Sequence, residues 1–183
     1  MEKDTIKLTA WKLDKSHSEI HFRIRHMMIS WVSGFFTEFE GSFESSDTDF
    51  GHISVDLTIN VDSISTSNVN RDEHLKSIDF FDAGRFPEIR FQSDNLVTSP
   101  VGNRKIKGVL TVHGISRTVE LDVEFAGISR DPWGNEKAGF SLSGSINRSD
   151  WGLSWNAPLE TGGFLVSDQV NIQGDIQLIR KES

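Results

Sequence analysis

The chain has 183 residues, which is enough for one domain with a sizeable core, and no shift in composition marks a linker within residues 1–183. Its 19 basic and 27 acidic residues give a formal net charge of −8, which disfavours nucleic acid and anionic membrane surfaces as partners. Cysteine is absent, which excludes disulfides, thiolate nucleophiles and cysteine-ligated zinc.

The first residues of the chain are charged and contain no apolar run of the length that a secretory signal needs. No later stretch approaches the length of a membrane span. These two features predict a cytoplasmic protein without membrane insertion.

Alternating apolar and polar residues begin at Ser18 and predict half-buried strands. The first strand, 18–28, has Ile20, Phe22, Ile24, His26 and Met28 in its apolar phase. The second, 35–43, is expected to place Phe35, Phe39 and Phe43 on one face. The third, 53–61, has the clearest alternation and centres on Leu57.

The stretch from Ile64 to Phe91 interrupts this pattern and predicts one short helix near residues 68–78. Asn68 or Ser67 is suited to cap the helix, and charged residues from Arg71 to Lys76 are suited to its surface. The aromatic residues that follow are Phe80, Phe81 and Phe86, and we expect them to face a barrel opening as a lid or plug.

Five further alternating segments follow, centred on 89–91, 106–112, 119–125, 140–146 and 170–178. About eight antiparallel strands, each with one apolar face, are typical of a mainly β sandwich or closed barrel. Four of them have glycine in the apolar phase, at Gly41, Gly108, Gly144 and Gly174. These glycines are suited to bending strands at barrel corners, or to leaving part of a lumen empty.

Candidate polar site residues are few. On a strand, His17 and His21 are too far apart to share one zinc ion, whereas His26 continues an inward phase and is suited either to the core or to a cavity mouth. Arg148 is suited either to an ion pair with Asp150 that braces the barrel end or to an anionic head group. No nucleophile elbow or phosphate-binding loop is present, so we expect no catalytic residues and no metal.

Four ordered segments together resemble the YceI-like family and extend over nearly the whole chain. They consist of Trp11, Asp14, His17-Ser18, Phe22 and His26; then Ser63-Ile64, Thr66, Asn68, Arg71-Asp72, His74-Leu75, Phe80, Pro87 and Phe91; then Gly108, Leu110-Thr111 and His113-Gly114; and finally Arg148, Asp150 and Gly152-Leu153. The resemblance implies a lipocalin-like antiparallel barrel that binds a polyisoprenoid or related lipid in its lumen, often as a homodimer.

The preferred hypothesis is therefore a non-enzymatic protein that binds, carries or sequesters an amphiphilic lipid and needs no other cofactor. The residues expected to contact the ligand are Phe22, Ile24, His26, Met28, Phe39, Leu57, Phe80, Phe81, Phe91, Leu110, Phe140, Leu142, Arg148 and Trp155. Two alternatives stay open: an enzyme for a small amphiphile with His26 or His74 as general base, and an interaction module with a solid core.

Overall fold

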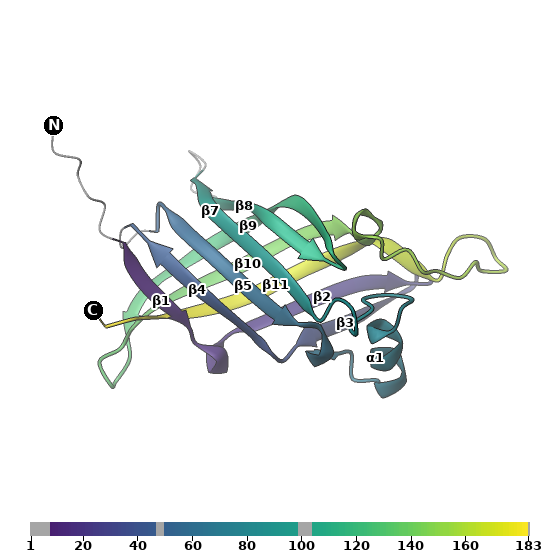
Figure 1. Cartoon of the computed structure of the whole chain (residues 1–183), viewed down its shortest axis with the longest axis horizontal. Helices are drawn as coiled ribbons and strands as arrows, with labels where there is room; N and C mark the ends of the chain where they lie inside the picture. The colour runs from purple at the N-terminus through teal and green to yellow at the C-terminus, as the bar shows by residue number, and fades with distance from the viewer. Residues whose placement is uncertain (1–7, 47–49, 99–103, 183) are drawn as a thin grey trace.

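The computed structural model describes residues 8–46, 50–98 and 104–182, which form one sheet of eleven strands rolled into a barrel (Figure 1). The strands are β1 (Thr9–Leu13), β2 (Glu19–His26), β3 (Ser30–Phe36), β4 (Phe39–Ser45), β5 (Ile53–Asn60), β6 (Ile64–Ser65), β7 (Glu88–Thr98), β8 (Arg104–Val112), β9 (Ile115–Arg130), β10 (Glu136–Asn147) and β11 (Val166–Arg180). One helix, α1 (Val69–Lys76), confirms the prediction of a short helix after the third strand.

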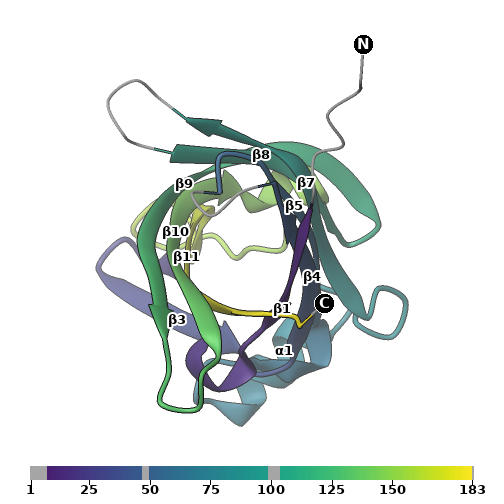
Figure 2. The ribbon, with the colours of Figure 1, turned by 90° about the vertical axis from the view of Figure 1, so that its left-hand side faces the viewer.

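The strands β1, β4, β5, β7, β8, β9, β10 and β11 follow one another around a ring, and pairing of β1 with β11 closes it. Figure 2 shows this ring from one end. Neighbouring strands are antiparallel, so the predicted antiparallel barrel of about eight strands is confirmed. The described part of the chain has no helix with the length and apolar character that a membrane span requires.

Two sides of the barrel consist of a strand that is interrupted and then resumes. A 3-10 turn at Lys15–His17 separates β1 from β2, and both strands pair with β11. Thr37 and Glu38 separate β3 from β4 in the same way. As a result β2, β3 and β6 extend the ring towards the end where α1 lies (Figure 1).

The second interruption corrects one sequence-based prediction. Phe36 and Phe39 are both 7% exposed, whereas Phe35 is 36% exposed. The expectation that Phe35 and Phe39 share a face is therefore wrong. An alternating pattern holds only within a continuous strand, and the two intervening residues move the inward phase by one position.

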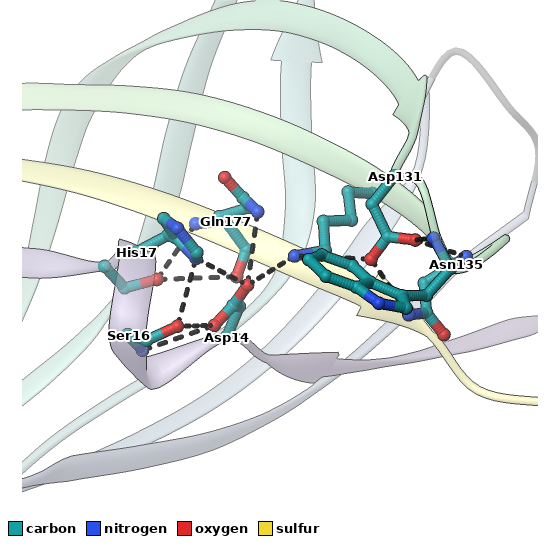
Figure 3. A network of polar contacts seen from close by, with 9 residues as sticks. Asp14, Ser16, His17, Asp131, Asn135 and Gln177 are labelled. Carbon is teal, nitrogen blue, oxygen red and sulfur yellow. Dashed lines mark hydrogen bonds and ion pairs between the residues drawn. The ribbon is translucent and has the colours of Figure 1, made fainter.

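A polar network at the first interruption fastens β1 and β2 to the strands beside them (Figure 3). One carboxylate oxygen of Asp14 accepts from the Ser16 hydroxyl (2.7 Å). The other oxygen accepts from Lys137 Nζ (2.9 Å) and Gln177 Nε2 (3.2 Å), and it lies 3.0 Å from His17 Nδ1. Burial raises the pKa of the Asp14 carboxyl, but hydrogen bonds from Ser16, Lys137 and His17 outweigh burial and hold this pKa well below its ordinary value. The carboxylate is therefore a structural anion at the strand break.

Aromatic side chains fill the barrel at the end where β1 begins and β11 ends, which we call the closed end. Phe50 is fully buried, and its ring centroid lies 5.0 Å from that of Trp11, 5.2 Å from that of Phe125 and 5.0 Å from that of Phe140. Such tilted and edge-to-face pairs pack densely and exclude water. The opposite end, which we call the mouth, is flanked by α1, the β2–β3 turn and the segment 152–165 (Figure 1).

Two of the inward glycines lie beneath large side chains of neighbouring strands. A Cβ atom at Gly108 would lie 2.6 Å from Cζ of Phe91, and one at Gly144 would lie 2.5 Å from Cδ2 of Leu121. Both glycines thus make room for a neighbour, a common use of glycine within sheets. The expectation that they leave lumen empty is wrong at these two positions, and the internal space depends instead on the diameter of the ring.

Candidate ligand-binding site

The barrel encloses a cavity of about 390 Å³ whose wall is almost entirely apolar. Its size is within the range of small-molecule sites, and side chains from every side of the ring contribute to it. Its apolar wall includes Ile20, Val32, Phe43, Val55, Ile89, Ile106, Val119, Leu121, Val123, Ile146, Val170, Ile172 and Ile176. The arrangement suits an apolar chain that enters from the mouth.

Most of the residues expected to contact a ligand do line this cavity. They are Phe22, Ile24, His26, Leu57, Phe80, Phe81, Phe91, Leu110, Phe140, Leu142, Arg148 and Trp155. Alternation predicted the strand positions among them, because inward-facing side chains of a barrel strand necessarily face the lumen. Phe80, Phe81, Arg148 and Trp155 lie outside the strands and were named from the aromatic and polar clusters of the sequence. The other inward residues of the wall carry the same signal, but the sequence reasoning named none from β9 or β11.

Met28 and Phe39 do not line the cavity. The inward phase of β2 ends at His26, and Met28 lies in the β2–β3 turn with its side chain 63% exposed. Phe39 is buried in a separate apolar cluster together with Phe36, Ile59 and Ile64. Met28 was expected to be inward from an alternation extended beyond its strand. Phe39 is buried in the same phase of β4 as Phe43, but its side chain lies outside the cavity wall.

Three rings meet at the mouth and join three separate segments of the chain. His74 on α1 contacts Phe80 with a centroid distance of 5.1 Å and Trp155 with one of 4.7 Å, and Phe80 lies 5.3 Å from Trp155. All three side chains line the cavity. We call His74, Phe80 and Trp155 the aromatic lid.

The base of α1 is fastened by a compact set of hydrogen bonds. Asn68 caps the helix by accepting from the Arg71 backbone N–H (3.0 Å). One Asp72 carboxylate oxygen accepts from the Thr66 backbone N–H (2.8 Å) and from the Thr66 hydroxyl (2.6 Å). Arg71 donates from Nε to the same hydroxyl (2.8 Å) and from Nη2 to the Thr66 carbonyl (2.9 Å). The charged residues of this helix thus hold the lid in place.

Phe86 differs from its two aromatic neighbours in the segment that follows α1. Its ring lies outside the cavity and contacts His113, with 4.9 Å between centroids. The expectation that Phe86 faces the opening is therefore wrong, whereas Phe80 and Phe81 both line the cavity as expected. The sequence offers no signal that distinguishes the three phenylalanines.

Arg148 is buried and donates to main-chain carbonyl groups of the segment around the mouth. The acceptors are the carbonyl oxygens of Leu153 (2.6 Å), Trp155 (2.9 Å), Ser167 (2.9 Å) and, at 3.5 Å, Val166. The expected ion pair with Asp150 is not among the contacts of Arg148 in the described residues. The guanidinium instead fixes the path of the chain from the 3-10 helix at Arg148–Trp151 to β11.

The ionisable residues along the cavity wall are all basic. They are His21, Arg25, His26, Arg71, His74 and Arg148, and no acidic residue occurs among the described residues of the wall. His21 and Arg25 belong to the outward phase of β2, where His21 contacts Glu19 and Arg25 lies over Trp31. Burial lowers the pKa of Arg148, and the nearby Asp168 carboxylate opposes this effect. The sequence reasoning assigned Arg71 and His74 to fastening the helix, with His74 also a candidate general base, and it did not include either among the ligand-binding residues. Their approach to the wall depends on how α1 docks. The described residues contain no group of three His, Cys, Asp or Glu side chains placed to hold a metal ion.

Comparison with known proteins gives consistent results along the whole described barrel. A family model described as a YceI-like domain matches residues 11–178. A UPF0312 protein of Staphylococcus aureus is 37% identical over 171 residues, which is 93% of this chain and 97% of that protein. The Campylobacter jejuni YCEI protein is 32% identical with a TM-score of 0.72, and the match covers 92% of this chain and 96% of that one.

Two more distant structures share the fold. Burkholderia cenocepacia BcnA is 21% identical with a TM-score of 0.75, covering 90% of this chain and 98% of its own. A polyisoprenoid binding domain from Saccharophagus degradans, implicated in plant cell wall breakdown, is 13% identical with a TM-score of 0.68, covering 94% and 99%. At these identities the likeness concerns the barrel itself.

Proposed function

The chain belongs to the YceI-like domain family, and we propose that it binds an amphiphilic lipid with a polyisoprenoid or similar tail in its barrel lumen. In this proposal the protein carries or sequesters the lipid and does not alter it chemically. The observation that carries the proposal is the apolar cavity inside the barrel with basic groups near its mouth.

The apolar wall accounts for affinity. Burying a methylene group contributes about 0.8 kcal/mol, so roughly ten such groups provide on the order of 8 kcal/mol before the cost of ordering the tail. Phe91, Leu110, Phe140 and Leu142 would contact the tail in the interior. Selectivity for the tail would then follow from the length and width of the lumen.

The mouth accounts for orientation. His26, Arg71 and Arg148 line the cavity there, and an oxygen-rich head group would find hydrogen-bond donors but no carboxylate among the described wall residues. Because the Arg148 donors already bind carbonyl groups, its role would be to hold positive charge at the mouth. Arg71 and His26 would make the closer contacts.

The likeness to the Saccharophagus degradans domain agrees with a polyisoprenoid ligand, although that likeness concerns the fold. The cavity itself argues against the alternative of a solid-cored interaction module. The enzymatic alternative has one observation in its favour, because His74 Nε2 lies 2.8 Å from an Asp79 carboxylate oxygen and a paired histidine is a common general base. It predicts conversion of the bound lipid, which the mass of recovered ligand would reveal.

The proposal is tested by native mass spectrometry of protein purified from its host, followed by extraction of the bound molecule. Ile172 lines the cavity, and Ile172→Trp should fill the lumen and abolish the bound mass. Gln169 is exposed on the same strand, so Gln169→Trp adds the same side chain outside the lumen and should leave binding unchanged. The proposal fails if wild-type protein is consistently empty and, when stripped, takes up neither prenyl alcohols, prenyl quinones nor fatty acids.

A further inference from the structure

The β2–β3 turn presents an exposed apolar tip. Met27, Met28 and Ile29 have exposed fractions of 41%, 63% and 78%. Phe164, on the neighbouring segment before β11, is 62% exposed. Single exposed apolar residues are ordinary, but four of them gathered at one end of a barrel mark an interaction surface.

The backbone of this tip is unfavourable for the residues that occupy it. Met27 and Met28 have φ angles of 52° and 60°, in the left-handed region. The Ile29 backbone N–H donates to the His26 carbonyl (3.2 Å), which makes Met27 and Met28 the two central residues of a β-turn. A β-turn with positive φ at both central residues favours Asn-Gly, because glycine and asparagine adopt positive φ at low cost. Methionine gains nothing from the turn geometry, so its presence at both positions indicates that the side chains serve an outward contact.

The tip is attached directly to the cavity mouth. The Met27 backbone N–H donates to the Leu165 carbonyl (2.8 Å), and His26 pairs with Val166. His26, Leu165 and Val166 all line the cavity. Whatever the apolar tip contacts therefore lies at the entrance of the lumen.

The hairpin behind the tip is locally cationic. Residues 20–37 contain Arg23 and Arg25 and no acidic residue, although the chain as a whole has a net charge of −8. Both guanidinium groups lie 4.7 Å from the ring centroid of Trp31, which is 41% exposed. Charges farther away than about 10 Å are largely screened at 0.1 M salt, so Arg23 and Arg25 act mainly on groups that come close to the outer face of the hairpin.

We infer that the β2–β3 hairpin docks the barrel mouth onto the surface of a lipid bilayer. Met27, Met28, Ile29 and Phe164 enter the region between the lipid head groups, and Trp31 lies at their level, where tryptophan is enriched. Arg23 and Arg25 face the lipid phosphates. This docking goes beyond lipid binding in the lumen, and it allows a lipid to pass between bilayer and cavity without crossing water.

A second copy of the chain is the competing occupant of this surface. In a two-fold dimer the same patch meets itself, so an arginine near the two-fold axis would face its own copy. Within the described part of the chain neither Arg23 nor Arg25 has a carboxylate at ion-pair distance to offset that repulsion. A bilayer surface offers an apolar region for the tip and phosphate groups for Arg23 and Arg25.

Vesicle co-sedimentation of the full chain tests this inference. With vesicles of equimolar phosphatidylcholine and phosphatidylglycerol, the wild-type protein should partition onto the lipid, and added salt should weaken binding. The double substitution Ile29→Ser and Phe164→Ser removes two exposed side chains that do not line the cavity, and it should reduce partitioning at least about tenfold. Trp133, 83% exposed in the β9–β10 turn at the closed end, provides the matched control Trp133→Ser, which should bind like the wild type.

Uptake of a prenyl alcohol by the double variant in detergent-free solution should be unchanged, which separates failure of docking from failure of lumen binding. Absence of vesicle binding by the wild type, or equal binding by the double variant, overturns the inference. Conversion of a wild-type dimer into a monomer by the double substitution, measured by sedimentation velocity, overturns it in favour of self-association.

Discussion

Two buried charged side chains, Arg148 and Asp14, have structural roles. Arg148 donates to main-chain carbonyls near the mouth, and Asp14 accepts from four side chains at the β1–β2 break. Buried charges are retained where several hydrogen bonds compensate for lost hydration. Neither residue needs a ligand to account for its charge.

Asp14 makes the stability of the barrel sensitive to acid. Its folded-state pKa lies below the ordinary value of 3.8, so its contribution is complete above that value and is lost as pH falls towards the folded-state pKa. Asp14→Asn should lower the free energy of unfolding at neutral pH by about 1.5–3 kcal/mol and should flatten the acid limb of the stability profile. Urea unfolding between neutral pH and pH 3 measures both effects.

Glu124→Gln is the control for this substitution, because Glu124 is exposed on β9 and loses the same charge. It should change the unfolding free energy by less than about 0.5 kcal/mol. If the unfolding free energy of Asp14→Asn falls with decreasing pH as steeply as that of the wild type, the Asp14 network is not the source of the acid sensitivity.

The aromatic lid is the element that connects the fold to ligand exchange. His74, Phe80 and Trp155 come from α1, the segment after it and the segment before β11, so opening the mouth requires these segments to separate. Ring pairs of this kind contribute about 0.5–1.5 kcal/mol each beyond their buried area. We therefore expect loss of a ring contact to change the rate of ligand exchange more than it changes the stability of the barrel.

Phe80→Ala removes two of the three ring contacts in the lid and should accelerate release of a bound fluorescent fatty acid or prenyl analogue by about tenfold. Stopped-flow transfer to an excess of unlabelled acceptor measures the rate. Phe86→Ala is the matched control, because Phe86 belongs to the same segment but contacts His113 outside the cavity. Equal acceleration by the two substitutions would show that general loosening of the segment, and not the lid, controls release.

At the scale of the whole molecule, the barrel is open to a ligand at one end and filled at the other. Phe50 packs against Trp11, Phe125 and Phe140 at the closed end, and Phe140 also lines the cavity. The depth of the lumen is therefore set by how far this aromatic cluster extends inward. This depth limits the length of tail that can be enclosed.

Phe50→Ala should extend the lumen and shift the bound lipids towards longer tails, at a cost of about 3–5 kcal/mol in the free energy of unfolding. Mass spectrometry of extracted ligands, with chemical denaturation in parallel, measures the two effects. Phe39→Ala removes a buried phenylalanine that does not line the cavity, so it should destabilise the barrel without changing the tail lengths. An unchanged distribution for Phe50→Ala would mean that the tail ends before the aromatic cluster.

The amino-acid sequence by itself determined the number and direction of the barrel strands, the position of α1 and part of the cavity wall. Leu57, Phe91, Leu110 and Leu142 were found from alternation alone, because a strand with one apolar face must direct that face to the interior. This information is local, and it remains correct for as long as a strand is continuous.

Only the tertiary structure decided where strands stop, what lies over the glycines and which partners the charged residues select. The break at Thr37 and Glu38 reversed the orientation of Phe35, and the turn after β2 placed Met28 in solvent. The acceptors of Arg148 and the rings around His74 come from segments distant in the chain, so no periodicity encodes them. The lumen and its lid follow from closure of the ring, which brings those segments together.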